Sequence, residues 1–386
     1  MCLSCNEYSV SEKQAESFLK YFPISINDNT GSEVIQTLNG GYVILSNFTN
    51  LGISGSDRDI PVIFCDEFGR QGSNSPLLVG TNGIDLGNSL LDINDGYIIA
   101  GSSSFTDRKQ GFLMKLGSDG QVLWQKNFGG FQEMEFLDVT QSLDNGFIAT
   151  GFSRNNSGKQ NVILLKVSAS GDSLWMREIP FDIFNGIGES VLEYEGERIL
   201  ITGTISPIGP TGSARQLILN TDLEGRGYTD LKISDDQDLF GKRIIRGSTG
   251  ELYILGNEVN ALSNASRVYL ARLELAGGGN EIVTIAASTY LDHQGSIYAF
   301  DIKPGFSGNM AICGWESAQN DFNIYFGLVD EDLRLVKSQS FGSKGYQSAH
   351  GLCITGDGGY ALTGTIDLGG GRTSMLLKLD NEGELR

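Results

Sequence analysis

Short apolar runs recur along the whole chain, each entered through a turn and closed by a small residue. Gly96–Gly101 (GYIIAG), Gly146–Gly151 (GFIATG) and Gly359–Gly364 (GYALTG) show the pattern clearly. Seven such runs close at Ser46, Gly101, Gly151, Gly203, Gly256, Gly314 and Gly364, at intervals of 55, 50, 52, 53, 58 and 50 residues. A period of this length is typical of stacked supersecondary units, so the pattern predicts a repeat protein.

Each run has the same apolar neighbours. A short apolar stretch such as Val34-Ile35 precedes it, and a third one such as VILLKV follows it across a polar loop. A tight turn with Gly comes next, and then a fourth stretch such as that around Trp124 or Trp175. Four strands joined by short turns describe one blade of a β-propeller. The sequence therefore predicts an all-β, seven-bladed propeller of four-stranded antiparallel blades, in which Trp124 and Trp175 pack between blades.

The two ends of the chain complement each other. The seventh repeat stops at Glu384-Leu385-Arg386, where its fourth strand should begin. An apolar segment at the start, Phe18–Ile26, resembles the fourth strand that begins at Trp124. We expect this N-terminal strand to close the last blade, which removes the free edges of the ring. Residues 1–17 are then a tether, and residues 18–386 form a single propeller domain.

The repeat resembles a known family. The units around Asp95–Gly101, Gly111–Leu116, Leu123–Lys126 and Phe128–Gly130 are similar to a propeller repeat common in secreted and lipid-anchored proteins of Bacteroidota. The resemblance covers nearly the whole chain from about residue 18. It implies a propeller fold and an extracytoplasmic location, and it brings no shared catalytic residues.

Charge excludes some partners. The chain has 47 acidic and 28 basic side chains and a net charge of −19, which disfavours nucleic acid and anionic lipid surfaces. The two histidines, His293 and His350, are too few for a metal site rich in imidazole, and we expect both to be solvated loop residues. The acidic turns, such as Asp380–Gly383, lack the ligand spacing of a calcium loop and are expected to be hairpin turns. No metal and no cofactor are expected.

The five cysteines fall into two groups. Cys65, Cys313 and Cys353 sit in apolar runs and are expected to be buried. Cys2 and Cys5 stand in a polar segment, and Leu3-Ser4-Cys5 loosely resembles the end of a lipobox. Either Cys2 or Cys5 is thus a candidate acylation site, which places the protein at the outer membrane or cell surface. An ordinary start with two chance cysteines is the alternative.

Candidate binding residues come from the start of the first strand of each blade, because these strands surround the central channel of a propeller. They are Glu33, Asn88, Asp138, Glu189, Arg243, Ser296 and His350. The acidic members either hold a cation or a ligand or accept backbone N–H groups from the next blade. Trp315 is a further candidate, because it follows the closing Gly314 and is expected in the loop after the second strand of blade six. There it offers an aromatic platform together with Phe322, Tyr325 and Phe326. The alternative is that Trp315 is buried under this loop.

No catalytic constellation stands out in the sequence. We therefore expect a non-enzymatic lipoprotein that docks an envelope or outer-membrane protein as a scaffold subunit. The alternative is a propeller that binds or cleaves a glycan, with a pair of rim carboxylates as catalysts; the sequence shows no aromatic ladder that would support it. A quinone-dependent dehydrogenase is disfavoured, because three Trp are too few for its cofactor pocket.

Overall fold

The computed structural model describes residues 17–24, 28–49, 58–81, 83–104, 108–130, 132–209, 211–233, 237–276, 282–305, 308–318, 321–342, 344–369 and 371–386. The candidate lipidation sites Cys2 and Cys5 lie outside the described residues, as does the turn glycine Gly277. Within the described part there is no helix long and apolar enough to cross a membrane.

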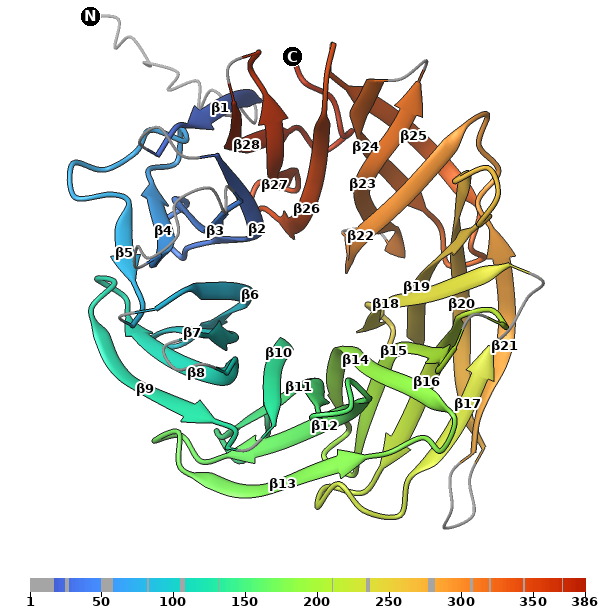
Figure 1. Cartoon of the computed structure of the whole chain (residues 1–386). Helices are drawn as coiled ribbons and strands as arrows, with labels where there is room; N and C mark the ends of the chain where they lie inside the picture. Colours follow the sequence, from blue (N-terminus) through green and yellow to red (C-terminus); the bar gives the residue numbers. More distant parts are fainter. Residues whose placement is uncertain are drawn as a thin grey trace, which may run out of the picture.

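The chain forms seven sheets of four antiparallel strands arranged in a ring, which confirms the predicted seven-bladed propeller (Figure 1). The innermost strands are β2 (Asn29–Gln36), β6 (Asp85–Ile93), β10 (Glu133–Gln141), β14 (Phe184–Tyr194), β18 (Asp238–Arg246), β22 (Ser296–Pro304) and β26 (Gln347–Ile354). The second strands are β3 (Tyr42–Phe48), β7 (Gly96–Ser103), β11 (Phe147–Arg154), β15 (Arg198–Pro207), β19 (Leu252–Val259), β23 (Met310–Ala318) and β27 (Tyr360–Asp367).

The two outer positions of each blade complete the sheets. The third strands are β4 (Ile60–Cys65), β8 (Gln110–Gly117), β12 (Gln160–Val167), β16 (Arg215–Thr221), β20 (Ser266–Ala276), β24 (Asp321–Val329) and β28 (Arg372–Leu379). The outermost strands are β5 (Leu77–Val79), β9 (Val122–Phe128), β13 (Ser173–Ile179), β17 (Thr229–Ile233), β21 (Ile282–Tyr290), β25 (Leu335–Phe341) and, for the seventh blade, β1 (Phe18–Phe22).

The core is divided among the blade interfaces. Second and third strands are apolar on both faces because each face packs against a neighbouring blade. Seven apolar clusters result within the described residues, one between each pair of neighbouring blades. The outermost strands β17 and β25 alternate between exposed and half-buried side chains, as expected for strands with one solvent-exposed face.

The N-terminal strand closes the ring. β1 pairs antiparallel with β28, with Phe18 opposite Lys378, and the Ser17 hydroxyl donates to the carbonyl of the C-terminal Arg386 at 2.6 Å. Phe18 also occupies the position of Trp124 and Trp175. Each of these three rings packs on the turn glycine of the next blade, where an added Cβ would meet the ring within 3 Å. The predicted closure and the predicted packing of both Trp residues are confirmed, although β1 ends at Phe22.

Blade six departs from the prediction at its last turn. The apolar pattern from Leu333 to Val336 predicts that its fourth strand begins at Leu333, but β25 begins at Leu335. Leu333 has φ of 64° and donates its N–H to the Asp330 carbonyl, the position that glycine takes in equivalent turns. Its side chain is buried in the cluster between blades five and six, which compensates the backbone cost.

Candidate functional site

Every innermost strand carries a β-bulge at the same height in the ring. The register shifts after Gly31, Gly87, Phe136, Gly188, Gly241, Ala299 and Ala349. We call the seven bulged residues the mouth layer: Ser32, Asn88, Leu137, Glu189, Lys242, Phe300 and His350. The residues that follow them form the inner layer: Glu33, Ser89, Asp138, Ser190, Arg243, Asp301 and Gly351. A bulge re-aims side chains, and here residues of both layers line cavities in the central channel.

The candidate binding residues that the sequence predicts are therefore divided between the mouth layer and the inner layer. Asn88, Glu189 and His350 belong to the mouth layer, whereas Glu33, Asp138 and Arg243 belong to the inner layer. All six lie inside strands, not in the loops that lead to them. Ser296 does not join them, because it begins β22 and its hydroxyl accepts the N–H of Ser266 at 2.6 Å. Its place in the ring is taken by Phe300 and Asp301.

Ion pairs across the channel hold the inner layer together. Arg243 of blade five contacts Asp301 at 3.1 Å and reaches Glu33 of blade one at 3.3 Å. Lys303 contacts Glu33 at 3.4 Å and Asp301 at 3.3 Å. Burial raises the pKa of Glu33 to about 7, against the opposing pull of Lys303 and Arg243. The protein's own cations thus occupy the space between these carboxylates.

Three other inner-layer contacts join neighbouring blades. Asp138 accepts the N–H of Val191 at 2.9 Å and the hydroxyl of Ser89 at 3.0 Å. Asp301 accepts the N–H of Leu352 in the next blade at 3.1 Å. These contacts match the structural alternative of the sequence analysis, in which rim carboxylates receive backbone N–H groups.

Six of the seven mouth-layer residues, all except Ser32, line a cavity of about 170 Å³, and Arg243 of the inner layer lines it too. Lys242 and Glu189 form an ion pair at 3.1 Å in this cavity, and the Tyr298 hydroxyl is hydrogen-bonded to Lys242. Burial lowers the pKa of Lys242, but Glu189 and Tyr298 outweigh it and leave that pKa above its ordinary value. Burial raises the pKa of Tyr298, so its phenol keeps its proton at neutral pH.

His350 is enclosed in the channel wall, and the prediction of a solvated loop histidine is wrong. Its Nδ1 donates to the carbonyl of Gly31 at 3.2 Å, which leaves Nε2 as the acceptor, 2.8 Å from the Ser348 hydroxyl. Burial lowers the pKa of His350 to about 4, so the ring is neutral at physiological pH. The edge of its ring meets Phe300 with 4.7 Å between the ring centres.

His293 is not a solvated loop residue either. Its side chain is 14% exposed, its Nε2 lies 3.5 Å from Glu316, and its ring packs against Tyr325. Both contacts are made away from the mouth layer, so the two histidines have separate surroundings.

A continuous row of aromatic rings leads away from the mouth layer. From Phe300 it passes to Tyr298 with 5.1 Å between ring centres, and to Trp315, which stacks on Tyr298 at 5.7 Å. It continues to Phe322 at 5.0 Å and to Tyr346 at 5.4 Å. All five rings are half-buried, so each one keeps part of its surface open.

Trp315 therefore lies where the sequence analysis did not put it. It belongs to β23, directly opposite Tyr298 of β22, and not to the loop after the strand. Of its predicted companions, Phe322 does join the row, but Tyr325 and Phe326 are buried in the core. The expectation that the chain has no aromatic ladder is wrong, because Tyr298, Phe300 and Tyr346 were not considered.

Sequence reasoning missed four residues of the site: Lys242, Tyr298, Phe300 and Asp301. The sequence holds part of the information needed to find them, because Lys242 and Phe300 occupy the same position in their repeats as Asn88 and Glu189 do in theirs. The bulge conceals it, since an extra residue shifts which positions face the channel.

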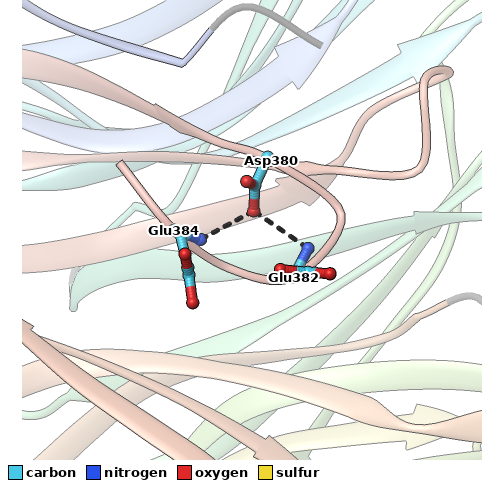
Figure 2. Close-up of side chains that lie close together, drawn as sticks. All are labelled: Asp380, Glu382 and Glu384. Atoms are coloured by element: carbon cyan, nitrogen blue, oxygen red, sulfur yellow. Dashed lines mark hydrogen bonds between the residues drawn. The ribbon is translucent and has the colours of Figure 1, made fainter. Parts of the chain in front are cut away.

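The acidic turn after β28 gathers three carboxylates, because Asp380, Glu382 and Glu384 each bring one oxygen into a common space (Figure 2). One oxygen of Asp380 accepts the N–H groups of Glu382 and Glu384 at 2.9 and 2.8 Å. Arg386 contacts all three carboxylates, and Lys337 contacts Glu384. The cluster is a hairpin turn neutralised by the protein's own cations, as the sequence predicts.

No family model matches the chain, and no curated protein matches its sequence. The fold is similar to solved propellers. A polysaccharide lyase of family PL25, an ulvan lyase bound to -[GlcA(1-4)Rha3S]-, is 10% identical with a TM-score of 0.59, over 92% of this chain and 95% of its own. A puromycin hydrolase is 10% identical with a TM-score of 0.57, over 94% of this chain and 55% of its own.

A third structure has the same ring with a different closure. The propeller domain of the Trilobed protease from Pyrococcus furiosus is 8% identical with a TM-score of 0.50, over 91% of this chain and 95% of its own. Its ring is described as an open velcro, whereas β1 latches the ring here. At these identities the likeness shows the fold alone.

The comparisons correct one expectation. We expected a non-enzymatic chain because no catalytic constellation stands out in the sequence. The polysaccharide lyase and the puromycin hydrolase share this fold over 92% and 94% of this chain, and both are enzymes. The lack of a catalytic motif in the repeat therefore does not indicate a non-enzyme, since sites are built on a fold by individual residues.

Proposed function

We propose that the protein is a carbohydrate-active propeller that binds a polysaccharide along the aromatic row and cleaves it at the mouth layer. The row of five half-open rings from Phe300 to Tyr346 is the observation that carries this proposal. Aromatic faces are apolar and suit the C–H faces of sugar rings, while the polar rim of the row supplies hydrogen bonds.

Two further features support the proposal. The row ends at a cavity lined by Lys242, Glu189 and His350, and titratable groups gathered in a cleft are typical of active sites. In addition, one of the similar propellers is a polysaccharide lyase. An extracytoplasmic location would bring the protein to such substrates, and that location stays a prediction.

Affinity electrophoresis in gels that contain one polysaccharide each tests this function. We expect retardation in at least one gel, and we expect Trp315→Ala to reduce the apparent affinity at least tenfold. Trp175→Ala is the matched control, because Trp175 lies on the outermost strand β13, away from the row. Circular dichroism confirms that each variant is folded, and Phe322→Ser is a second probe of the row. Equal retardation of all variants would contradict the proposal.

A further inference from the structure

We propose that the polysaccharide is neutral and that the ion pair of Lys242 and Glu189 recognises it, with one sugar hydroxyl donating to Glu189 and a neighbouring hydroxyl accepting from Lys242. This inference rests on the proposed function and specifies its substrate class and two residues that select the substrate.

The cations of the channel already have anionic partners. Four carboxylates and three cations line the two channel cavities: Glu33, Asp138, Glu189 and Asp301 against Lys242, Arg243 and Lys303. Each cation lies 3.1–3.4 Å from at least one of these carboxylates. His350 adds no cation, because its low pKa keeps the ring neutral. The described part of the channel therefore offers an anionic sugar no unpaired cation.

The far end of the aromatic row carries carboxylates as well as a cation. Arg372 lies over the Tyr346 ring, 4.5 Å from its centre. Asp367 is directly opposite Arg372 in the pairing of β27 with β28, and Asp321 accepts the N–H of Gly345 at 2.9 Å. The net charge of −19 adds a long-range repulsion of polyanions.

An acidic sugar would have to break the ion pair in the mouth cavity. Its carboxylate would take Lys242 from Glu189 and leave the Glu189 carboxylate without a cation, next to a second negative charge. Repulsion at such short range and an uncompensated, partly buried charge are both unfavourable. Acidic polymers are therefore disfavoured at the mouth layer.

A neutral sugar uses the same ion pair without breaking it. The Lys242 and Glu189 side chains are 21% and 22% exposed, so a ligand can reach both. Among the described residues, Lys242 is bonded to Glu189 and to Tyr298, and an ammonium carries three N–H groups. One oxygen of Glu189 accepts from Lys242, which leaves the second oxygen for a donor. Adjacent sugar hydroxyls donate and accept, so they bridge the two ions with charge-assisted hydrogen bonds.

The ion pair lies at the end of the aromatic row. Phe300 lines the same cavity as Lys242 and Glu189, and Tyr298, which is bonded to Lys242, lies between Phe300 and Trp315 in the row. The aromatic rings thus hold the C–H faces of the sugars, and the ion pair selects the hydroxyls of the sugar at the mouth.

Retention of the full chain on beads that carry one polymer each tests the inference. Glucomannan, laminarin and dextran are the neutral polymers, and alginate and polygalacturonate are the acidic ones. We expect retention on at least one neutral polymer and on neither acidic polymer. Retention at about 20 mM and about 500 mM NaCl should differ by less than about twofold, because the polymer forms no ion pair with the protein.

Two variants test the role of the ion pair. Glu189→Gln should weaken retention on the neutral polymer about tenfold, through the loss of a hydrogen bond to a charged group. It should also create salt-sensitive retention on the acidic polymers, because Lys242 then lacks its carboxylate. Lys242→Met should weaken neutral retention to a similar extent without creating acidic retention. The exposed Glu274→Gln is the matched control and should change neither, and circular dichroism confirms that each variant is folded.

The outcomes separate the two claims. Wild-type retention on the acidic polymers alone would overturn the neutral substrate class and leave a carbohydrate-binding propeller, and this result needs no variant. Retention of Glu189→Gln that equals the wild type on every polymer would overturn the role of the ion pair. An absence of retention on every polymer, neutral or acidic, would overturn the proposed function as well.

Discussion

Glu33 shows how a single buried charge is balanced in the channel. Its carboxylate lies within reach of Arg243 and Lys303, yet its pKa is raised from 4.5 to about 7 because burial removes it from water. Desolvation of a buried ion commonly exceeds the gain from its partners. The ionised form of Glu33 is therefore a net cost to the folded chain.

A substitution of this residue has a pH-dependent effect of defined sign. Between about pH 4.5 and 7 the unfolded chain has released the Glu33 proton while the folded chain keeps it, so wild-type stability falls as pH rises through this window. Glu33→Gln should match the wild type near pH 4 and be more stable at pH 8, by about 2–3 kcal/mol. Urea unfolding across this pH range measures the difference.

The exposed Glu274→Gln serves as the control for this experiment, because the difference from the wild type should not change with pH. A Glu33→Gln variant that is less stable than the wild type at pH 8 would show that the ion pairs with Arg243 and Lys303 outweigh burial.

Asp138 joins neighbouring blades in the same layer. Asp138→Ala removes the acceptor of the Val191 N–H and leaves a buried donor without a partner. Such a loss costs about 1–3 kcal/mol, and we expect a lower free energy of unfolding by this amount. Denaturant unfolding at pH 7 measures it, and Asp230→Ala on the outer strand β17 is the control. A change below about 0.5 kcal/mol would show that Val191 finds another partner.

The strands illustrate what the sequence can predict at the scale of elements. Second strands such as β7 and β11 are buried on both faces, so their apolar runs are long and bounded by turns, and the prediction placed them correctly. The closing strand β1 was found because Phe18, Lys20 and Phe22 repeat the spacing of Trp124, Lys126 and Phe128. In these strands the local sequence pattern correctly predicts the place that each strand takes in its blade.

The candidate site was harder to predict for a physical reason. The β-bulge in each innermost strand adds one unpaired residue, which disturbs the alternation from which facing directions are inferred. Six of the seven predicted binding residues line the channel, but the prediction put them into one ring, whereas the bulge divides them between two layers. The aromatic row joins β22, β23, β24 and Tyr346, which precedes β26, and contacts between separate segments leave no spacing in the sequence.

The latch made by β1 is itself testable. Phe22 is 3% exposed and packs in the cluster between blades seven and one, whereas its neighbour Tyr21 is 44% exposed. Phe22→Ala should lower the free energy of unfolding by about 3–5 kcal/mol. Tyr21→Ala on the same strand should have an effect below about 1 kcal/mol. Thermal unfolding and size-exclusion chromatography give the readout.

Release of the latch also exposes the edge of β28. We expect association of Phe22→Ala at temperatures below its unfolding transition, because an unpaired strand edge is a template for another chain. An unchanged melting temperature and a monomeric elution profile would show that the ring does not depend on β1.

At the scale of the whole molecule, the residues that stabilise the fold differ from the mouth-layer residues that we propose to act on the polysaccharide. Seven apolar clusters between blades and the β1 latch hold the ring, and they make no use of the mouth layer. The mouth layer differs in chemistry from blade to blade at one geometric position, with amide, carboxylate, ammonium, imidazole and aromatic groups. A rigid ring with variable residues at its bulges is suited to carry a specific site on a common fold.

A crystal structure of the chain with a bound oligosaccharide of the polymer that it retains in affinity electrophoresis tests the central claim most directly. We expect sugar rings along Tyr346, Phe322 and Trp315, with the last sugar over Phe300 at the mouth layer. An oligosaccharide bound on the opposite face of the ring or on the outermost strands, with the mouth layer untouched, would contradict it.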